Sequence, residues 1–158
     1  MQRVFIGQHD RTIDPKNRVQ LPSPFRSAID PDRDGAGLYV TLGDDPGTLS
    51  LYTERVFEEF TGRIETEFMD DEESLQFERE FYAYAYHIDL DKQGRFVIPD
   101  RLRQIARLGD EIYLVGRKFR IDVWNRVDFD RSVTIDPSGQ TWHKWRRFTR
   151  MRPSGSKE

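Results

Sequence analysis

The sequence predicts an α+β fold built from two similar halves, and an internal repeat is the main evidence. Three pairs of segments match between the halves: 14–22 with 91–99, 38–41 with 112–115, and 49–53 with 121–125. The members of the first pair lie 77 residues apart, and each contains an Asp-x-x-x-Arg sequence, an alternating apolar stretch and a proline. Self-similarity of this kind indicates one module of strands and helices that is used twice.

Each module begins with a tight turn at its Asp-x-x-x-Arg sequence. The carboxylates of Asp14 and Asp91 can accept hydrogen bonds from backbone N–H groups of the residues that follow. Asn17 and Gly94 occupy matching places, and these residue types tolerate the left-handed backbone of a three-residue hairpin loop that closes on a bulge. We therefore expect a hairpin tip in each half, braced by Asp14, Asn17, Asp91 and Gly94.

A half-buried strand and then a helix are expected after each tip. Apolar and polar residues alternate over 18–21 and again over 95–98, as they do in strands with one buried face. Pro22 and Pro99 end these strands, and Ser23 and Asp100 are the expected N-caps of the helices that follow.

An antiparallel strand pair follows in each half, 38–42 with 49–52 and 111–115 with 119–124. Thr53 and Asn125 are the expected N-caps of the next helices. A further helix is predicted over 71–82, with Leu75, Phe77 and Phe81 as candidate buried residues. Its many acidic residues indicate a solvated helix that connects the halves.

The charge is unevenly distributed along the chain. The segment from Glu54 to Glu80 has a net charge of -8 and residues 142–158 have a net charge of +5, although the whole chain carries only -3. Local patches decide what a surface attracts, so the total charge does not exclude binding to nucleic acid. The chain divides into a first repeat (1–62), an acidic connecting helix (63–82), a second repeat (83–132) and a basic C-terminal extension (133–158).

The extension contains Trp142, Trp145 and Phe148, whose spacing suits one face of a helix. Docking on a neighbouring protomer, or mobility, is favoured over contact with nucleic acid for this segment.

Several classes of protein are disfavoured. The chain has no cysteine, and His9, His87 and His143 lack the spacing of metal ligands, so we expect no metal and no cofactor. No apolar run approaches the roughly 18 residues that span a membrane, so a cytoplasmic protein is expected. No nucleophile elbow, phosphate-binding glycine loop or catalytic triad is recognisable, so an enzyme with a small-molecule substrate is the least favoured class.

Both Asp-x-x-x-Arg tips, the proline before an arginine-containing helix, Tyr113-Leu114-Val115-Gly116 and Asp122-Val123-Trp124 together resemble the MraZ family over roughly residues 4–132. This family of bacterial transcriptional regulators belongs to the AbrB-like, swapped-hairpin superfamily. The resemblance implies a swapped-hairpin β-barrel made of two AbrB-like half repeats with flanking helices. It also implies that several protomers assemble into a ring.

In the family, the tips lie on one face of the ring and contact double-stranded DNA at short G-rich direct repeats, typically upstream of the regulator's own division and cell-wall operon. The resemblance carries this role to Arg18 and Arg95, whose guanidinium forks suit guanine O6 and N7 or phosphate. Lys16 and Lys92 suit phosphate. The expected location is therefore the nucleoid. Family members commonly have Gly where this chain has Asn17.

The acidic stretch 70–73 would repel DNA, so we expect it to face away from the tips. Two alternatives to a DNA-binding regulator remain open. One is a ring-forming scaffold without DNA binding, which recruits a basic protein partner through the acidic middle helix. The other is an antitoxin-like member that holds a toxin through its tail, although such proteins usually carry one motif per chain.

Overall fold

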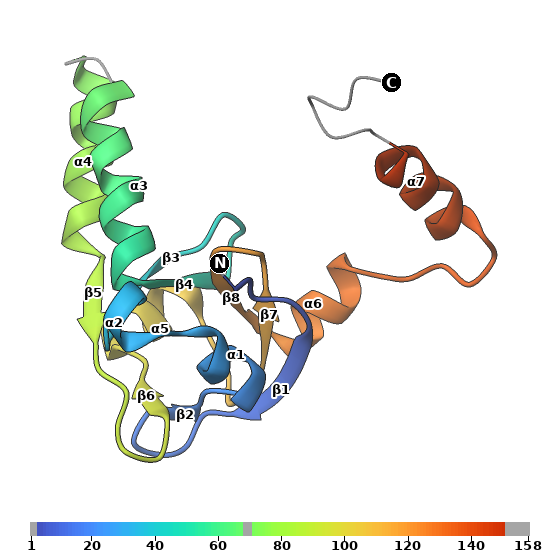
Figure 1. The fold of residues 1–158 in the computed structure, drawn as a ribbon, viewed down its shortest axis with the longest axis horizontal. Coiled ribbons are helices and arrows are strands. Elements are labelled where there is room, and N and C mark those ends of the chain that lie inside the picture. Colours follow the sequence, from blue (N-terminus) through green and yellow to red (C-terminus); the bar gives the residue numbers. More distant parts are fainter. Residues whose placement is uncertain (1–2, 68–70, 151–158) are drawn as a thin grey trace.

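The computed structural model describes residues 3–67 and 71–150, whose arrangement is shown in Figure 1. The strands are β1 (Gln8–Thr12), β2 (Arg18–Gln20), β3 (Leu38–Leu42), β4 (Thr48–Thr53), β5 (Tyr86–Ile88), β6 (Arg95–Val97), β7 (Glu111–Gly116) and β8 (Ile121–Asn125). The helices are α1 (Ser23–Ala28), α2 (Pro31–Asp34), α3 (Glu54–Glu67), α4 (Glu72–Ala83), α5 (Asp100–Ala106), α6 (Arg126–Ser132) and α7 (Gln140–Thr149). This mixture of helices with antiparallel sheet confirms the α+β class.

The larger sheet shows how the two halves combine. Its strand order is β1-β7-β8-β4-β3-β5, and every neighbouring pair is antiparallel. The sequence repeat makes β3 and β4 of the first half equivalent to β7 and β8 of the second. β1 pairs with β7 and β5 pairs with β3, so the first strand of each half joins the strand pair of the other half. The strand order is therefore symmetric about the contact between β4 and β8.

The second sheet is a two-stranded ribbon in which β2 pairs with β6. The expected hairpin turn is present at each tip, but the hairpin does not continue into a ladder between the strands on either side of it. The turns close, with Asp14 N–H donating to the Arg18 carbonyl at 3.0 Å and Asp91 N–H donating to the Arg95 carbonyl at 2.9 Å. The strands that enter and leave each turn nevertheless pair with other strands, because the β2–β6 ribbon places Val19 opposite the equivalent Phe96 and buries both.

The core contains apolar side chains from both halves. Its members from the repeated strand and helix are Val19, Leu21, Phe25, Phe96, Ile98 and Leu102, each at most 1% exposed. These positions agree with the alternating pattern in the sequence. Since equivalent residues of both halves fill one core, neither half buries its apolar face alone.

Two of the expected N-caps are wrong. Helix α1 begins at Ser23 with Pro22 at the N-cap, and α5 begins at Asp100 with Pro99 at the N-cap; neither cap residue makes a side-chain hydrogen bond. The prolines already have the extended backbone of an N-cap residue, which shifts each helix start by one position. The Asp100 carboxylate instead accepts a hydrogen bond from the Asn17 amide.

The later caps differ from each other. Thr53 behaves as expected, because its hydroxyl accepts a hydrogen bond from Val56 N–H at 3.3 Å. Asn125 occupies the N-cap position of α6 without capping it. Its side-chain oxygen accepts from Gly109 N–H at 2.8 Å, and its amide donates to the Arg107 carbonyl at 3.1 Å. The side chain therefore ties the β8 end to the loop after α5.

Helices α3 and α4 lie side by side and project from the sheet (Figure 1). The helix expected over 71–82 is confirmed as α4, and the helix expected after Thr53 is α3, which continues to Glu67 and so includes the start of the segment 63–82 that was expected to connect the halves. Aromatic rings hold them together, with the Phe57 and Phe60 rings of α3 at 6.0 and 5.8 Å from the Phe81 ring of α4. Leu75 and Phe77 are not buried, since each is 39% exposed, and Phe81 is half-buried.

Residues 140–149 of the C-terminal extension form α7, which lies at the right of Figure 1, at the opposite end of the molecule from α3 and α4. The part of the extension after Arg150 lies outside the described residues. Among the helices described, none has both the length and the apolar character needed to cross a membrane.

Candidate nucleic-acid interface

The first Asp-x-x-x-Arg turn is organised around the Asp14 carboxylate. It accepts hydrogen bonds from Lys16 N–H at 2.9 Å, from Arg18 N–H at 2.8 Å and from Arg18 Nε at 2.7 Å. Hydrogen bonds to a carboxylate favour its charged form, so these donors, the Arg18 N–H above all, lower the pKa of Asp14 below its ordinary value. One charged side chain therefore holds both the turn backbone and the Arg18 side chain.

The second turn repeats this geometry. Asp91 accepts from Gln93 N–H at 2.9 Å, from Arg95 N–H at 2.9 Å and from Arg95 Nε at 2.8 Å. Its pKa is lowered in the same way, first by the Arg95 N–H. Two independent parts of the chain thus fold into equivalent turns with an arginine fixed at the same place.

The third residue after each aspartate has a left-handed backbone, with φ of +61° at Asn17 and +76° at Gly94. This conformation aims a backbone carbonyl at the opposite half. Ile98 N–H donates to the Asn17 carbonyl and Leu21 N–H donates to the Gly94 carbonyl, both at 2.9 Å. These two bonds extend the β2–β6 pairing and fix the two turns relative to each other.

The ribbon brings both arginines to one outward face. Arg18 lies opposite Val97, and Gln20 lies opposite Arg95. Because side chains alternate along a strand, these four share the face turned away from buried Val19 and Phe96. Arg18 and Arg95 are diagonal neighbours across the pair, which places such residues about 7–8 Å apart.

The arginine forks are available for a ligand. Each Nε is engaged by its aspartate, yet within the described residues neither Arg18 nor Arg95 has a partner for its Nη atoms. The side chains remain 33% and 30% exposed. A guanidinium held through Nε and open at Nη can donate two hydrogen bonds in a fixed plane, as bidentate recognition of guanine or phosphate requires.

Lys16 and Lys92 lie on the exposed loops of the two turns. Neither ammonium group makes an ion pair with any residue described in the structure. Their charge therefore adds to that of the arginines at the same end of the molecule.

Four further residues at this site were not singled out from the sequence. Gln20 and Val97 lie on the ribbon's outer face, and Val97 is 49% exposed. Arg103 Nη1 donates to the Asn17 side-chain oxygen at 2.6 Å, while the equivalent Arg26 donates to the Lys92 carbonyl at 3.3 Å. The sequence contained two signals for these residues. Arg26 and Arg103 occupy equivalent places in the repeat, and the alternation of side chains along a strand puts Gln20 on the same face as Arg18.

The turns and the free end of the α3–α4 pair lie at opposite ends of the molecule (Figure 1). Residues 71–73 of the acidic stretch thus lie far from the turns, as expected, while Asp70 is outside the described residues. In the described part of the chain, no group of three or more acidic or histidine side chains is placed to hold a metal ion.

Comparison with known proteins agrees with the sequence motifs. Residues 81–148 match the family model described as "MraZ protein, putative antitoxin-like". The match includes most of α7, so the family pattern continues beyond residue 132, where the resemblance was expected to end.

Curated relatives extend the match to the first half. The chain is 36% identical over 132 residues to "Transcriptional regulator MraZ" of Mycoplasmopsis synoviae (strain 53), covering 80% of this chain and 85% of the relative. Proteins of the same name from Roseiflexus sp. (strain RS-1) and Finegoldia magna are each 32% identical, covering 77% and 81% of this chain and 80% and 85% of the relatives. These relatives are named as regulators and not as enzymes, and together the matches show that the chain belongs to the MraZ family.

Proposed function

We propose that this protein is a sequence-specific, DNA-binding transcriptional regulator that contacts double-stranded DNA through its two Asp-x-x-x-Arg turns. The observation that carries this proposal is the shared outward face of Arg18 and Arg95, each fixed through Nε and open at Nη. The names of the relatives as transcriptional regulators support a role in transcription. In this role Asp14, Asn17, Asp91 and Gly94 brace the turns, and the protein acts in the cytoplasm at the nucleoid.

Each residue type has a distinct part in the proposed contact. Arg18 and Arg95 donate to guanine O6 and N7, a pairing that discriminates between bases. Lys16 and Lys92 neutralise phosphates, which adds affinity without sequence preference. The aspartates stay ionised, since their pKa values are lowered, and hold the forks in place before DNA arrives.

The proposed fold is the swapped-hairpin β-barrel of the AbrB-like superfamily. Its support is the strand exchange, in which β1 joins β7 and β5 joins β3 while β2 and β6 pair across the halves. We further propose a ring of several protomers that binds short direct repeats upstream of its own division and cell-wall operon. Tethered turns convert later binding events into intramolecular ones, so repeated DNA boxes match repeated turns.

Titration of DNA from upstream of the protein's own gene tests this proposal. Fluorescence anisotropy at two salt concentrations compares the wild type with Arg18→Gln/Arg95→Gln, and circular dichroism checks the fold of the variant. Arg131→Gln is the matched control, because Arg131 is an exposed arginine on α6, away from the turns. We expect the double variant to lose discrimination against competitor DNA, at about 1–3 kcal/mol per bidentate contact, while the control binds like the wild type.

Unchanged binding by the folded double variant would show that the turns do not contact DNA. The acidic α3–α4 pair supports a second candidate, a scaffold for a basic protein partner. Its prediction differs, since the wild type would then show no salt-sensitive DNA binding at all.

A further inference from the structure

Helix α7 has an aromatic face and a separate basic face. Trp142, Trp145 and Phe148 recur every three residues on one side and are 56%, 59% and 64% exposed. Lys144 and Arg146 flank this face, and Arg147 and Arg150 lie behind it. Throughout residues 3–67 and 71–150, these four cations make no ion pair.

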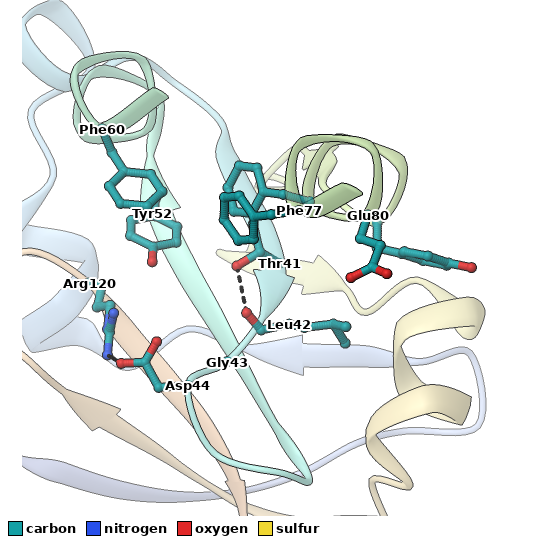
Figure 2. A pocket seen from close by; sticks show the side chains of 11 residues that line it. Thr41, Leu42, Gly43, Asp44, Tyr52, Phe60, Phe77, Glu80 and Arg120 are labelled. Atoms are coloured by element: carbon teal, nitrogen blue, oxygen red, sulfur yellow. Dashed lines mark hydrogen bonds and ion pairs between the residues drawn. The ribbon is translucent and has the colours of Figure 1, made fainter. Parts of the chain in front are cut away.

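The α3–α4 pair offers a surface of opposite charge that also carries aromatic rings. A cavity of about 320 Å³ is lined by the rings of Tyr52, Phe60, Phe77 and Phe81, and Figure 2 shows the first three of them. The Asp44–Arg120 ion pair, at 2.6 Å, closes one end and Glu80 stands at the other. We call this cavity the aromatic groove.

The aromatic groove continues along α4 into an acidic hollow. Phe77 and Glu80 line both, and the hollow adds Glu72, Glu73, Gln76 and Arg79, so its lining has three carboxylates and one cation. No described cation pairs with Glu72, Glu73 or Glu80. The surface therefore combines apolar rings with uncompensated carboxylates, as α7 combines apolar rings with uncompensated cations.

We propose that α7 of one copy docks on the α3–α4 pair of a second copy, with its aromatic face toward the aromatic groove and the flanking cations Lys144 and Arg146 against the acidic hollow. Charge complementarity and the exposed rings of α7 and Phe77 identify the occupant. Within one chain, α7 and the α3–α4 pair lie at opposite ends of the molecule, at the right and left of Figure 1, which favours a neighbour over self-docking.

The two docking surfaces differ, so the contact is heterologous, and repeated contacts of this type close into a ring when the rotation between protomers permits it. The inference thus rests on the oligomer proposed above and assigns the surfaces that build it. It also assigns the basic tail to assembly and leaves DNA contact to the turns.

Light scattering coupled to size-exclusion chromatography tests the aromatic part. We expect an oligomer for the wild type and a fall in mass to the monomer for Trp142→Ser/Trp145→Ser. Val127→Ser is the matched control, because Val127 is 65% exposed on α6 and belongs to neither surface. A double variant that stays fully oligomeric would overturn the docking while leaving the oligomer intact, whereas a monomeric wild type would overturn both.

Charge reversal tests the pairing itself and the choice of a second copy. One chain carries Lys144→Glu/Arg146→Glu on α7 and another carries Glu73→Arg/Glu80→Arg on α4. We expect each chain alone to be monomeric and an equimolar mixture to assemble. In the mixture, the acidic α7 of the first chain can meet the basic α4 of the second, and the unchanged α7 of the second can meet the unchanged α4 of the first. Recovery also shows that both variants are folded.

Other outcomes contradict the proposal. One such outcome is that each reversal alone lowers the free energy of unfolding, the chain with both reversals regains it, and the wild type and all variants are monomeric. In that case α7 docks on its own chain. If the α7 variants keep the wild-type mass and lose affinity for DNA, α7 is a nucleic-acid contact.

Discussion

The buried carboxylate of Asp34 makes the stability of this protein depend on pH in a defined way. Asp34 is 3% exposed and accepts hydrogen bonds from Arg33 at 2.7 and 2.9 Å, from Arg55 Nε at 3.2 Å and from Asp30 N–H at 2.9 Å. These donors, Arg33 first, lower its pKa from 3.8 to about 2. The residue thereby ties α2 to the first turn of α3.

Replacing Asp34 by Asn keeps the volume and removes the charge. A pKa lowered from 3.8 to about 2 corresponds to about 2 kcal/mol of stability that requires the ionised carboxylate. That contribution is present above the unfolded pKa of 3.8 and is lost as the pH falls toward 2. We therefore expect Asp34→Asn to lower the free energy of unfolding by at least about 2 kcal/mol at pH 7, and by progressively less between pH 4 and pH 2.

Urea unfolding at one protein concentration, followed by circular dichroism at pH 7, 4 and 2.5, measures this difference; the concentration is fixed because assembly adds to apparent stability. Asp32→Asn is the control, since Asp32 is exposed on the same helix and changes at such sites are usually within about 0.5 kcal/mol. An equal gap between wild type and Asp34→Asn at pH 7 and pH 2.5 would refute the role of the charge.

Two further predictions concern the turns. Gly94→Ala should lower the free energy of unfolding by about 1–2 kcal/mol. The reason is that Gly94 has φ of +76° and that a Cβ there would lie 2.7 Å from Arg26 Nη1. The control is Gly62→Ala on α3, where a Cβ meets nothing within 4 Å, and this change should raise the free energy of unfolding by up to about 1 kcal/mol. Equal urea midpoints for the two variants would contradict this. Lys16→Gln should weaken binding to all DNA sequences alike and reduce the slope of log K against log salt by about 1, while the exposed Lys118→Gln should not; a change in sequence preference would argue for base contact by Lys16.

The sequence predicts the strands of each repeat better than it predicts which strands pair with one another. The alternation around Val19 and Phe96 correctly gives two half-buried strands, since it depends only on which residues are apolar. It cannot say that these strands pair with each other, because nothing local distinguishes a partner in the same half from one in the other half. For this reason the turns at the tips are as expected, while the strands on either side of each turn pair with other strands.

The caps and the middle helices show a second kind of limit. Ser23 and Asp100 have good capping side chains, but the preceding prolines already adopt the extended backbone, and Asp100 is used to bind Asn17. Phe77 fits an apolar helix face, yet its ring stacks on Phe81 at 5.7 Å in the wall of the aromatic groove and stays 39% exposed instead of entering a core. At the interface, the arginines could be named from the motif, whereas Gln20 and Val97 join them only through the β2–β6 register.

The strand exchange explains why one chain can present two equivalent Asp-x-x-x-Arg turns on one face. Each turn lies between a strand that pairs with the other half and a strand of the central ribbon, so neither turn can move without disturbing both halves. The carbonyls of Asn17 and Gly94 reinforce this, because each accepts its hydrogen bond from the opposite half. Arg18 and Arg95 are therefore held at a fixed separation by backbone geometry, and the fold itself sets the spacing at which one protomer can contact two sites on DNA.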